Sequence, residues 1–185
     1  HELQEEWSPF WKTNKEVFVE FSTTNLLKSR FLQQHFPDAI PVFVLRHPIA
    51  YAYSLDNQFP NAGFSIEDLV RHWIFTHQKW MQDCQHLDDF MLVFYEDLLE
   101  NPQEVCKRIF KKVGLAEFEI DPKIELPKYT AKAQESWELE FEATKNQIKQ
   151  WENYLVDFPY SLENESLTKM LATTLLSVLT LTYLT

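Results

Sequence analysis

Short apolar runs alternate along the chain with longer stretches in which apolar residues recur every three or four positions. Three runs are rich in β-branched and aromatic side chains, which predicts strands at residues 17–20 (VFVE), 41–45 (PVFVL) and 90–95 (FMLVFY). The run at 41–45 is almost wholly apolar, as is typical of a strand covered on both faces.

The stretches with helical spacing carry start and stop signals. Residues 65–84 place apolar side chains on one face and begin at Ser65, with Asp68 in the position that completes a capping box. A second helix is predicted over 101–113, and Gly114 follows it where a left-handed C-terminal cap belongs.

Further helices are predicted in three other places. The side chains of residues 22–25 (STTN) suit the N-terminal cap of a helix that ends before Pro37. Pro48 suits the first position of another helix, and residues 135–151 have helical character.

The order strand, helix, strand predicts an α/β fold. Such units form parallel sheets, so we expect at least three parallel strands with helices on both faces. We assign residues 1–165 to this α/β domain and residues 166–185 to an apolar C-terminal segment packed as a helix or strand. The apolar stretch at 169–185 falls short of the roughly 20 residues of a spanning helix, so a membrane anchor is not supported.

Glycine is scarce. The 185 residues contain two glycines, Gly63 and Gly114, so no glycine-rich nucleotide-binding loop can be written in this sequence. A nucleotide held by these residues would need another kind of contact.

Charge and cysteine content narrow the class further. A formal net charge of −11 argues against nucleic-acid binding, and an anionic ligand would need a local cluster of cations. Cys84 and Cys106 match no disulfide framework or zinc spacing, and His72 and His77 point to different sides of a helix. We therefore expect no metal site.

The carboxyl ends of the predicted strands are where an α/β fold binds ligands. Arg46 follows the second strand, Pro48 opens the next helix, and an anion there would meet a guanidinium and helix N–H groups. Ser54, two turns into that helix, could add a hydroxyl donor. The alternative is a surface Arg46 neutralised by an Asp, with Ser54 an ordinary helix residue.

Two other strand ends carry polar residues. Tyr95 follows the third strand and could donate to a phosphate or pack on a base. Residues 96–100 (EDLLE) are most simply a solvated turn, although Glu96 could hold a cation or cap that turn. Capping alone explains the hydroxyls of residues 20–25 after the first strand.

These residues resemble sulfotransferases that use 3′-phosphoadenosine 5′-phosphosulfate (PAPS), particularly the group that includes protein-tyrosine and carbohydrate sulfotransferases. The match runs in the family's order across most of residues 5–164. The matching stretches are EEWSPFWKTNKEVFVEFSTTNLLKSRFLQQHFPDA, VFVLRHPIAYAYS, HWIFTHQKWMQDCQHL, FYEDLLENPQEVCKRIFKKVGL and FPYSLEN.

The resemblance implies roles for three residues. Arg46 and Ser54 would bind the 3′-phosphate of PAPS or of its product PAP, and Tyr95 would contact the nucleotide. It also implies a P-loop-like α/β sheet and an acceptor hydroxyl on a protein tyrosine, a carbohydrate or a small molecule. Family members occur in the Golgi lumen and as soluble bacterial enzymes, so the Golgi lumen and the cytoplasm both stay open.

The sequence also departs from the family pattern. The family's first strand and 5′-phosphosulfate loop would precede everything seen here. Phe21 stands where many relatives have Lys, Thr23 where they have Pro, and Gln58 where some tyrosine-sulfating members have Arg. The resemblance therefore covers the C-terminal portion of such an enzyme, and no catalytic residue can be named.

Two hypotheses follow for function. The first is sulfuryl transfer from PAPS to an acceptor hydroxyl, once the missing N-terminal segment completes the domain; this chain by itself is expected to be inactive. The second is a catalytically inactive, sulfotransferase-derived domain that serves as a structural or interaction subunit of a larger assembly.

Overall fold

The computed structural model describes residues 2–11, 14–15, 17–116, 118–121, 139, 142–155, 158 and 160. Its α-helices and strands are α1 (Glu2–Trp7), α2 (Ser29–His35), β1 (Val42–Leu45), α3 (Pro48–Gln58), α4 (Ile66–Cys84), β2 (Met91–Phe94), α5 (Tyr95–Glu100) and α6 (Pro102–Lys112). Short 3₁₀ helices are η1 (Ser8–Phe10), η2 (Thr23–Leu27) and η3 (Lys149–Leu155).

The chain divides into two compact units. Unit 1 comprises His1–Phe43 and Thr76–Met91, and unit 2 comprises Val44–Phe75 and Leu92–Thr185. The strands and α4 each contribute residues to both units.

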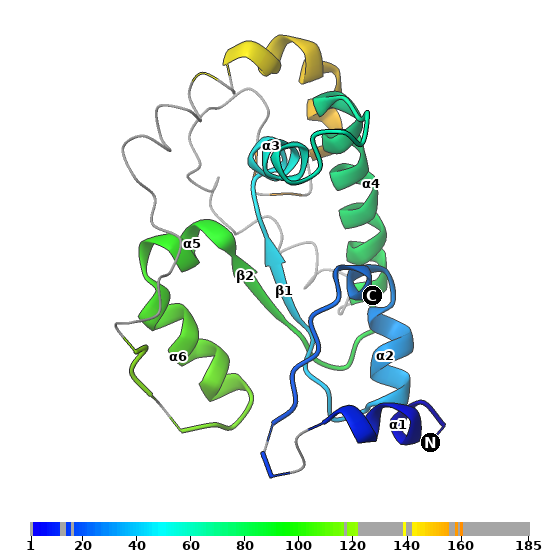
Figure 1. Cartoon of the computed structure of the whole chain (residues 1–185), viewed down its shortest axis with the longest axis vertical. Coiled ribbons are helices and arrows are strands. Elements are labelled where there is room, and N and C mark those ends of the chain that lie inside the picture. The colour runs from blue at the N-terminus through cyan, green and yellow to red at the C-terminus, as the bar shows by residue number, and fades with distance from the viewer. Residues whose placement is uncertain are drawn as a thin grey trace, which may run out of the picture. The chain divides into compact units, whose positions relative to one another are not determined.

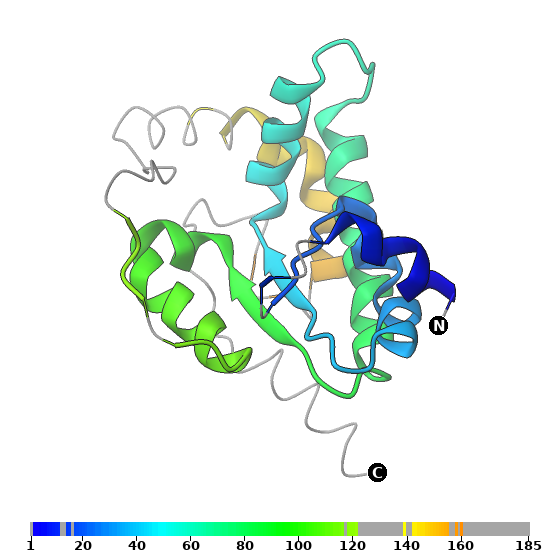
Figure 2. The same cartoon turned by 60° about the horizontal axis from the view of Figure 1, so that its bottom comes forward.

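The sheet consists of two parallel strands flanked by helices, which confirms the predicted α/β class. Figures 1 and 2 both show α3 continuing from the end of β1 and α5 from the end of β2. Within β1, Phe43 and Leu45 are buried, whereas the side chain of Val44 is 51% exposed. Complete coverage of both faces of this strand was therefore a wrong expectation.

The strand predicted at residues 17–20 is also wrong, because this segment has no regular structure. Val19 is 79% exposed and Phe21 is 89% exposed. A strand needs a neighbour that takes up its backbone N–H and C=O groups, and local β propensity does not report whether a neighbour exists. The described part of the chain consequently has two paired strands, not three.

Hydrogen bonds of the Gln33 side chain join α2 to the segment before β2 within unit 1. The Gln33 side chain donates to the backbone carbonyl of Asp89 at 3.0 Å and accepts from the N–H of Asp88 at 2.8 Å. Phe43 packs against Trp80 and Phe90 in the same unit, with ring centroids 4.9 and 5.9 Å apart. Because Gln33 is itself buried, its two bonds satisfy an amide that would otherwise be costly.

The N-terminal cap predicted for α2 is wrong. Residues 23–27 form η2, and Ser22, which precedes η2, makes no side-chain capping bond. Instead the Glu20 carboxylate accepts hydrogen bonds from the N–H and hydroxyl of Ser22 and from the amide of Asn25. The predicted end of α2 before Pro37 is confirmed.

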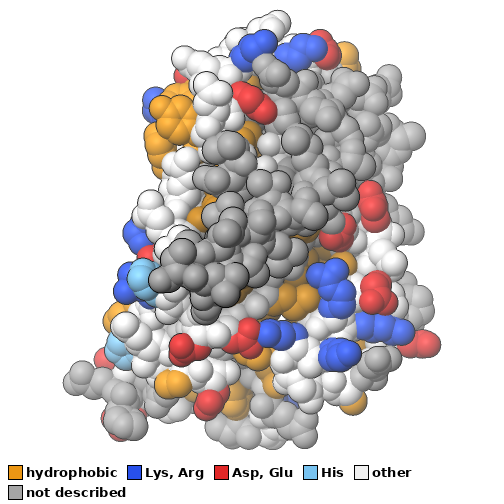
Figure 3. Space-filling view, turned by 180° about the vertical axis from the view of Figure 1, so that it is seen from behind, with side chains coloured by type: hydrophobic (Ala, Val, Ile, Leu, Met, Phe, Trp, Pro, Cys, Tyr) orange, Lys and Arg blue, Asp and Glu red, His pale blue; other side chains and the backbone are white. Residues whose placement is uncertain are grey.

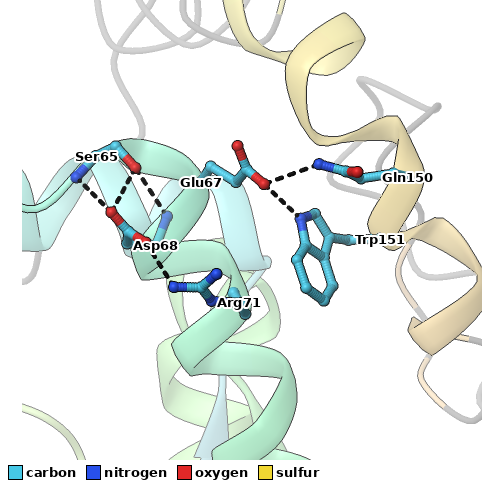
Figure 4. A network of polar contacts seen from close by, with 6 residues as sticks. All are labelled: Ser65, Glu67, Asp68, Arg71, Gln150 and Trp151. Carbon is cyan, nitrogen blue, oxygen red and sulfur yellow. Dashed lines mark hydrogen bonds and ion pairs between the residues drawn. The ribbon is translucent and has the colours of Figure 1, made fainter.

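Unit 2 contains both predicted capping motifs. Ser65 Oγ accepts from the N–H of Asp68 at 3.1 Å, and the Asp68 carboxylate accepts from the Ser65 N–H at 3.2 Å (Figure 4). Gly114 has a φ of 75°, and the N–H of Leu115 donates to Phe110 O at 2.9 Å. These bonds start α4 and end α6 as the sequence predicts.

Figure 4 also shows how η3 attaches to the first turn of α4. A Glu67 carboxylate oxygen accepts from Gln150 Nε2 at 2.8 Å and from Trp151 Nε1 at 3.1 Å. Helical character is confirmed for residues 142–148, whereas 135–138 and all of 166–185 lie outside the described residues.

Replacing Ser65 with Ala should lower the free energy of unfolding by about 1 kcal/mol, because the Asp68 N–H loses its side-chain acceptor. Urea denaturation of both proteins at pH 7 measures this difference. Ser54→Ala, at an exposed position inside α3, is the control and should leave stability unchanged. Equal stability of Ser65→Ala and the wild type would contradict the capping box.

The difference between Ser65→Ala and the wild type should shrink in acid. The Ser65 side chain and then its backbone N–H hold the pKa of Asp68 below its usual range. A depressed carboxyl pKa contributes stability that is lost as pH falls, here below about pH 4. Repeating the denaturation between neutral pH and about pH 3 checks the sign, which a widening difference would refute.

Candidate functional site

Arg46 and Tyr95 meet at the carboxyl ends of the two strands, within unit 2. Arg46 is the first residue after β1, and Tyr95 is the first residue after β2. The guanidinium carbon of Arg46 lies 4.7 Å from the centroid of the Tyr95 ring. Parallel strands end at the same edge of a sheet, and this places a cation on an aromatic face there.

The guanidinium keeps its hydrogen-bonding capacity. Arg46 is half-buried, and no carboxylate among the described residues lies within ion-pair distance of it. The alternative expectation of an Arg46 neutralised by an Asp therefore finds no support in the described part of the chain. A planar guanidinium on an aromatic ring can still bind a phosphate or sulfate group through two parallel N–H donors.

Glu96 lies beneath this position and is buried. Its Oε1 accepts a hydrogen bond from the backbone N–H of His47 at 2.9 Å, and its Oε2 accepts one from the Tyr160 hydroxyl at 2.9 Å. The predicted solvated turn at residues 96–100 is wrong, because α5 begins directly at Tyr95 and turns Glu96 inward. The carboxylate links the residues after β1 and β2 to a distant part of the sequence.

Aromatic side chains surround the hydroxyl that Glu96 binds. The Tyr160 ring packs edge-to-face on His47, Trp73 and Phe94, with centroid separations of 5.3, 6.0 and 6.2 Å. Burial, followed by the charge of Glu96, raises the pKa of Tyr160 well above its usual range, and the charge of Arg46 opposes this effect. Tyr160 therefore stays protonated and donates to the carboxylate.

His47 changes the expectation for the start of α3. Pro48 occupies the first helical position as predicted, but His47 Nδ1 accepts from the N–H of Ile49 at 3.3 Å. An acceptor Nδ1 carries no proton. One first-turn N–H that was expected to be available to an anion is thus taken by the cap.

Ser54 lies on α3 as predicted and is exposed. Within the described part of the chain, no hydrogen bond joins Ser54 to Arg46. The structure therefore brings Arg46 and Tyr95 together and leaves Ser54 on the helix that begins beside them. Gln58, at the position of a family arginine, is also exposed and is the last residue of α3.

Two further findings concern the described residues alone. They contain no group of three or more His, Cys, Asp or Glu side chains that could hold a metal ion. No helix formed by them is long and apolar enough to cross a membrane.

The protein has an α/β fold in which the two strand ends bring the guanidinium of Arg46 onto the ring of Tyr95. A family model described as "Sulfotransferase family" matches residues 6–119, more than half of the chain. The chain belongs to the sulfotransferase family, as its sequence motifs indicated. No curated protein and no solved structure matched the chain.

Sequence reasoning missed the joint role of Glu96 and Tyr160. A glutamate after a strand and before other acids has the composition of a solvated turn. The available signal was that β2 leads straight into α5, since a helix that begins at Tyr95 turns the next side chain toward the interior. Tyr160 is separated from Glu96 by 64 positions, and no local sequence pattern predicts a contact over that separation.

Tyr160 should make the wild type lose stability in alkali. A folded-state pKa above the unfolded value means that the native protein retains a proton that the unfolded chain releases, so the free energy of unfolding falls above about pH 10. Denaturation between pH 8 and about pH 11 should show a steeper fall for the wild type than for Tyr160→Phe. Burial also raises the pKa of Tyr51, but this residue is present in both proteins and does not affect the comparison. If the stabilities of the two proteins fall in parallel with pH, the raised pKa of Tyr160 is refuted.

Proposed function

We propose that this sulfotransferase-family chain binds PAPS and PAP through their 3′-phosphate, with Arg46 as the principal ligand. The supporting observation is a half-buried guanidinium on the Tyr95 ring with no carboxylate partner among the described residues. Ser54 would donate its exposed hydroxyl, and Tyr95 would contact the nucleotide as well as carry Arg46.

The described residues fit a phosphate on chemical grounds. A bare phosphate needs several donors, and we expect contributions from the guanidinium of Arg46, directly after β1, and from the exposed hydroxyl of Ser54, about two turns into α3. A half-buried arginine that binds an anion also needs neighbours without negative charge, since an ion pair with a carboxylate would use its N–H donors. The Tyr95 face gives that support without consuming an N–H donor.

The reaction that we propose is sulfuryl transfer to an acceptor hydroxyl. PAPS supplies the sulfuryl group when it is bound, and the acceptor would be a protein tyrosine, a carbohydrate or a small molecule. The role of Arg46 is to bind and orient the 3′ end of the cofactor, because fixing the reacting partners in position removes much of the entropic barrier. We assign no general base within the described residues.

The second candidate is an inactive domain that serves as an interaction subunit. It is favoured by the segment after residue 16, where Phe18, Val19 and Phe21 are 44%, 79% and 89% exposed and where the family has a lysine at the position of Phe21. Exposed apolar side chains close together are typical of protein contacts. This candidate predicts no sulfuryl transfer.

Arg46→Ala should weaken PAP binding at least about tenfold, because a hydrogen-bonded contact to a charged group is worth about 1.5–3 kcal/mol. Calorimetric titration of the full chain with PAP measures the change. Arg71→Ala is a matched control, because Arg71 also lies over an aromatic ring, that of Trp151, with 5.9 Å between the guanidinium carbon and the ring centroid. It should leave PAP affinity unchanged.

Three results are informative. Loss of PAP affinity in Arg46→Ala alone supports the assignment, whereas equal affinity of Arg46→Ala and the wild type overturns it. Transfer of radiolabelled sulfate from PAPS to any of a panel of tyrosine peptides and sugars would exclude the inactive interaction subunit. PAP binding without transfer agrees with both candidates, because the resemblance covers only the C-terminal portion of such an enzyme.

A further inference from the structure

We propose that Glu96 is a positioning residue for the anion site, which it controls by fixing the backbone that carries Arg46. This inference rests on the proposed function, because it concerns the same 3′-phosphate. Its occupant remains the phosphate of PAP or PAPS, and Glu96 itself does not touch the ligand.

Each oxygen of Glu96 has one partner from a different part of the chain. Oε1 accepts from the N–H of His47, 49 positions away, and Oε2 accepts from the hydroxyl of Tyr160, 64 positions away. The side chain is buried, with 7% relative exposure. The first bond fixes the peptide that directly follows Arg46.

A buried carboxylate resists any movement that removes its partners. No cation among the described residues lies within ion-pair distance of Glu96, so its partners there are the two hydrogen-bond donors. Shifting the His47 N–H would leave a buried anion short of a hydrogen bond, which is strongly unfavourable. The peptide between Arg46 and His47 is therefore held in one orientation.

The residue next to Glu96 holds the other end of Arg46. The Tyr95 ring carries the guanidinium at 4.7 Å, so two consecutive residues at the β2–α5 junction fix both the backbone and the side chain of this arginine. His47 in turn caps α3 through Nδ1, which fixes the direction in which the helix leaves the site. Such preorganisation improves affinity because less freedom is lost on binding.

The experiment compares two ligands on the full chain. PAP and 5′-AMP differ only in the 3′-phosphate, so the ratio of their dissociation constants reports the site around Arg46 and cancels changes in the rest of the nucleotide pocket. Arg46→Ala sets the ratio expected when the contact is absent. General damage to the fold would weaken the binding of both ligands and leave the ratio of their dissociation constants unchanged.

Glu96→Ala should reduce the preference for PAP about tenfold and change 5′-AMP affinity less than about threefold, because it removes both acceptors. Glu96→Gln keeps a carbonyl oxygen that can accept from the His47 N–H, and it should retain most of the preference. Rescue by Gln separates positioning through a hydrogen bond from a role of the negative charge.

Tyr160→Phe provides a variant that keeps the buried ring and removes only the bond to Oε2. We expect it to lower the PAP preference severalfold, because the carboxylate loses one of its two anchors. Tyr53→Phe is the matched control: its hydroxyl bonds to Thr144 Oγ1 in the same unit, and its loss should leave the ratio unchanged.

The outcomes separate the two proposals. If the wild type does not prefer PAP over 5′-AMP, or if Arg46→Ala keeps that preference, the proposed function fails. If Arg46→Ala loses the preference while Tyr160→Phe and every folded Glu96 variant keep it, the positioning role alone is overturned. Should Glu96→Ala not fold, Tyr160→Phe still decides the matter, because it is expected to lower the preference severalfold.

Discussion

One buried carboxylate joins the parts of unit 2 on which the proposed site depends. Glu96 accepts hydrogen bonds from the backbone after β1 and from the hydroxyl of Tyr160. A charged group in an apolar setting is tolerated only where donors meet it, so its neighbours are constrained together. The His47 N–H that it accepts from belongs to the peptide directly after Arg46, and Tyr95 directly precedes Glu96 in the chain.

Membership of the sulfotransferase family is compatible with the acidic composition of the chain, because the binding of an anion depends mainly on the charges close to it. The formal net charge is −11, yet Figure 3 shows Lys and Arg side chains gathered where α6 lies, and α6 ends in Lys111 and Lys112. An anion near Arg46 meets the field of its immediate neighbours more strongly than that of distant screened charges. A negative overall charge is therefore compatible with a single anionic ligand.

Local signals predicted the described fold well where the physics is local. The capping box at Ser65 and the left-handed Gly114 each follow from residues close in sequence. The prediction failed at residues 17–20, where strand formation depends on a partner, and at Glu96, whose partners lie 49 and 64 positions away. The contact between Arg46 and Tyr95 follows from parallel strands that end at one edge, whereas binding roles for Arg46, Tyr95 and Ser54 stay predictions.

The most direct test is a structure of the full chain determined with PAP. We predict that the 3′-phosphate contacts the guanidinium of Arg46 while the Tyr95 ring still packs against that guanidinium and Glu96 still accepts from the His47 N–H. A phosphate bound elsewhere, with Arg46 turned to solvent or paired with a carboxylate, would contradict it.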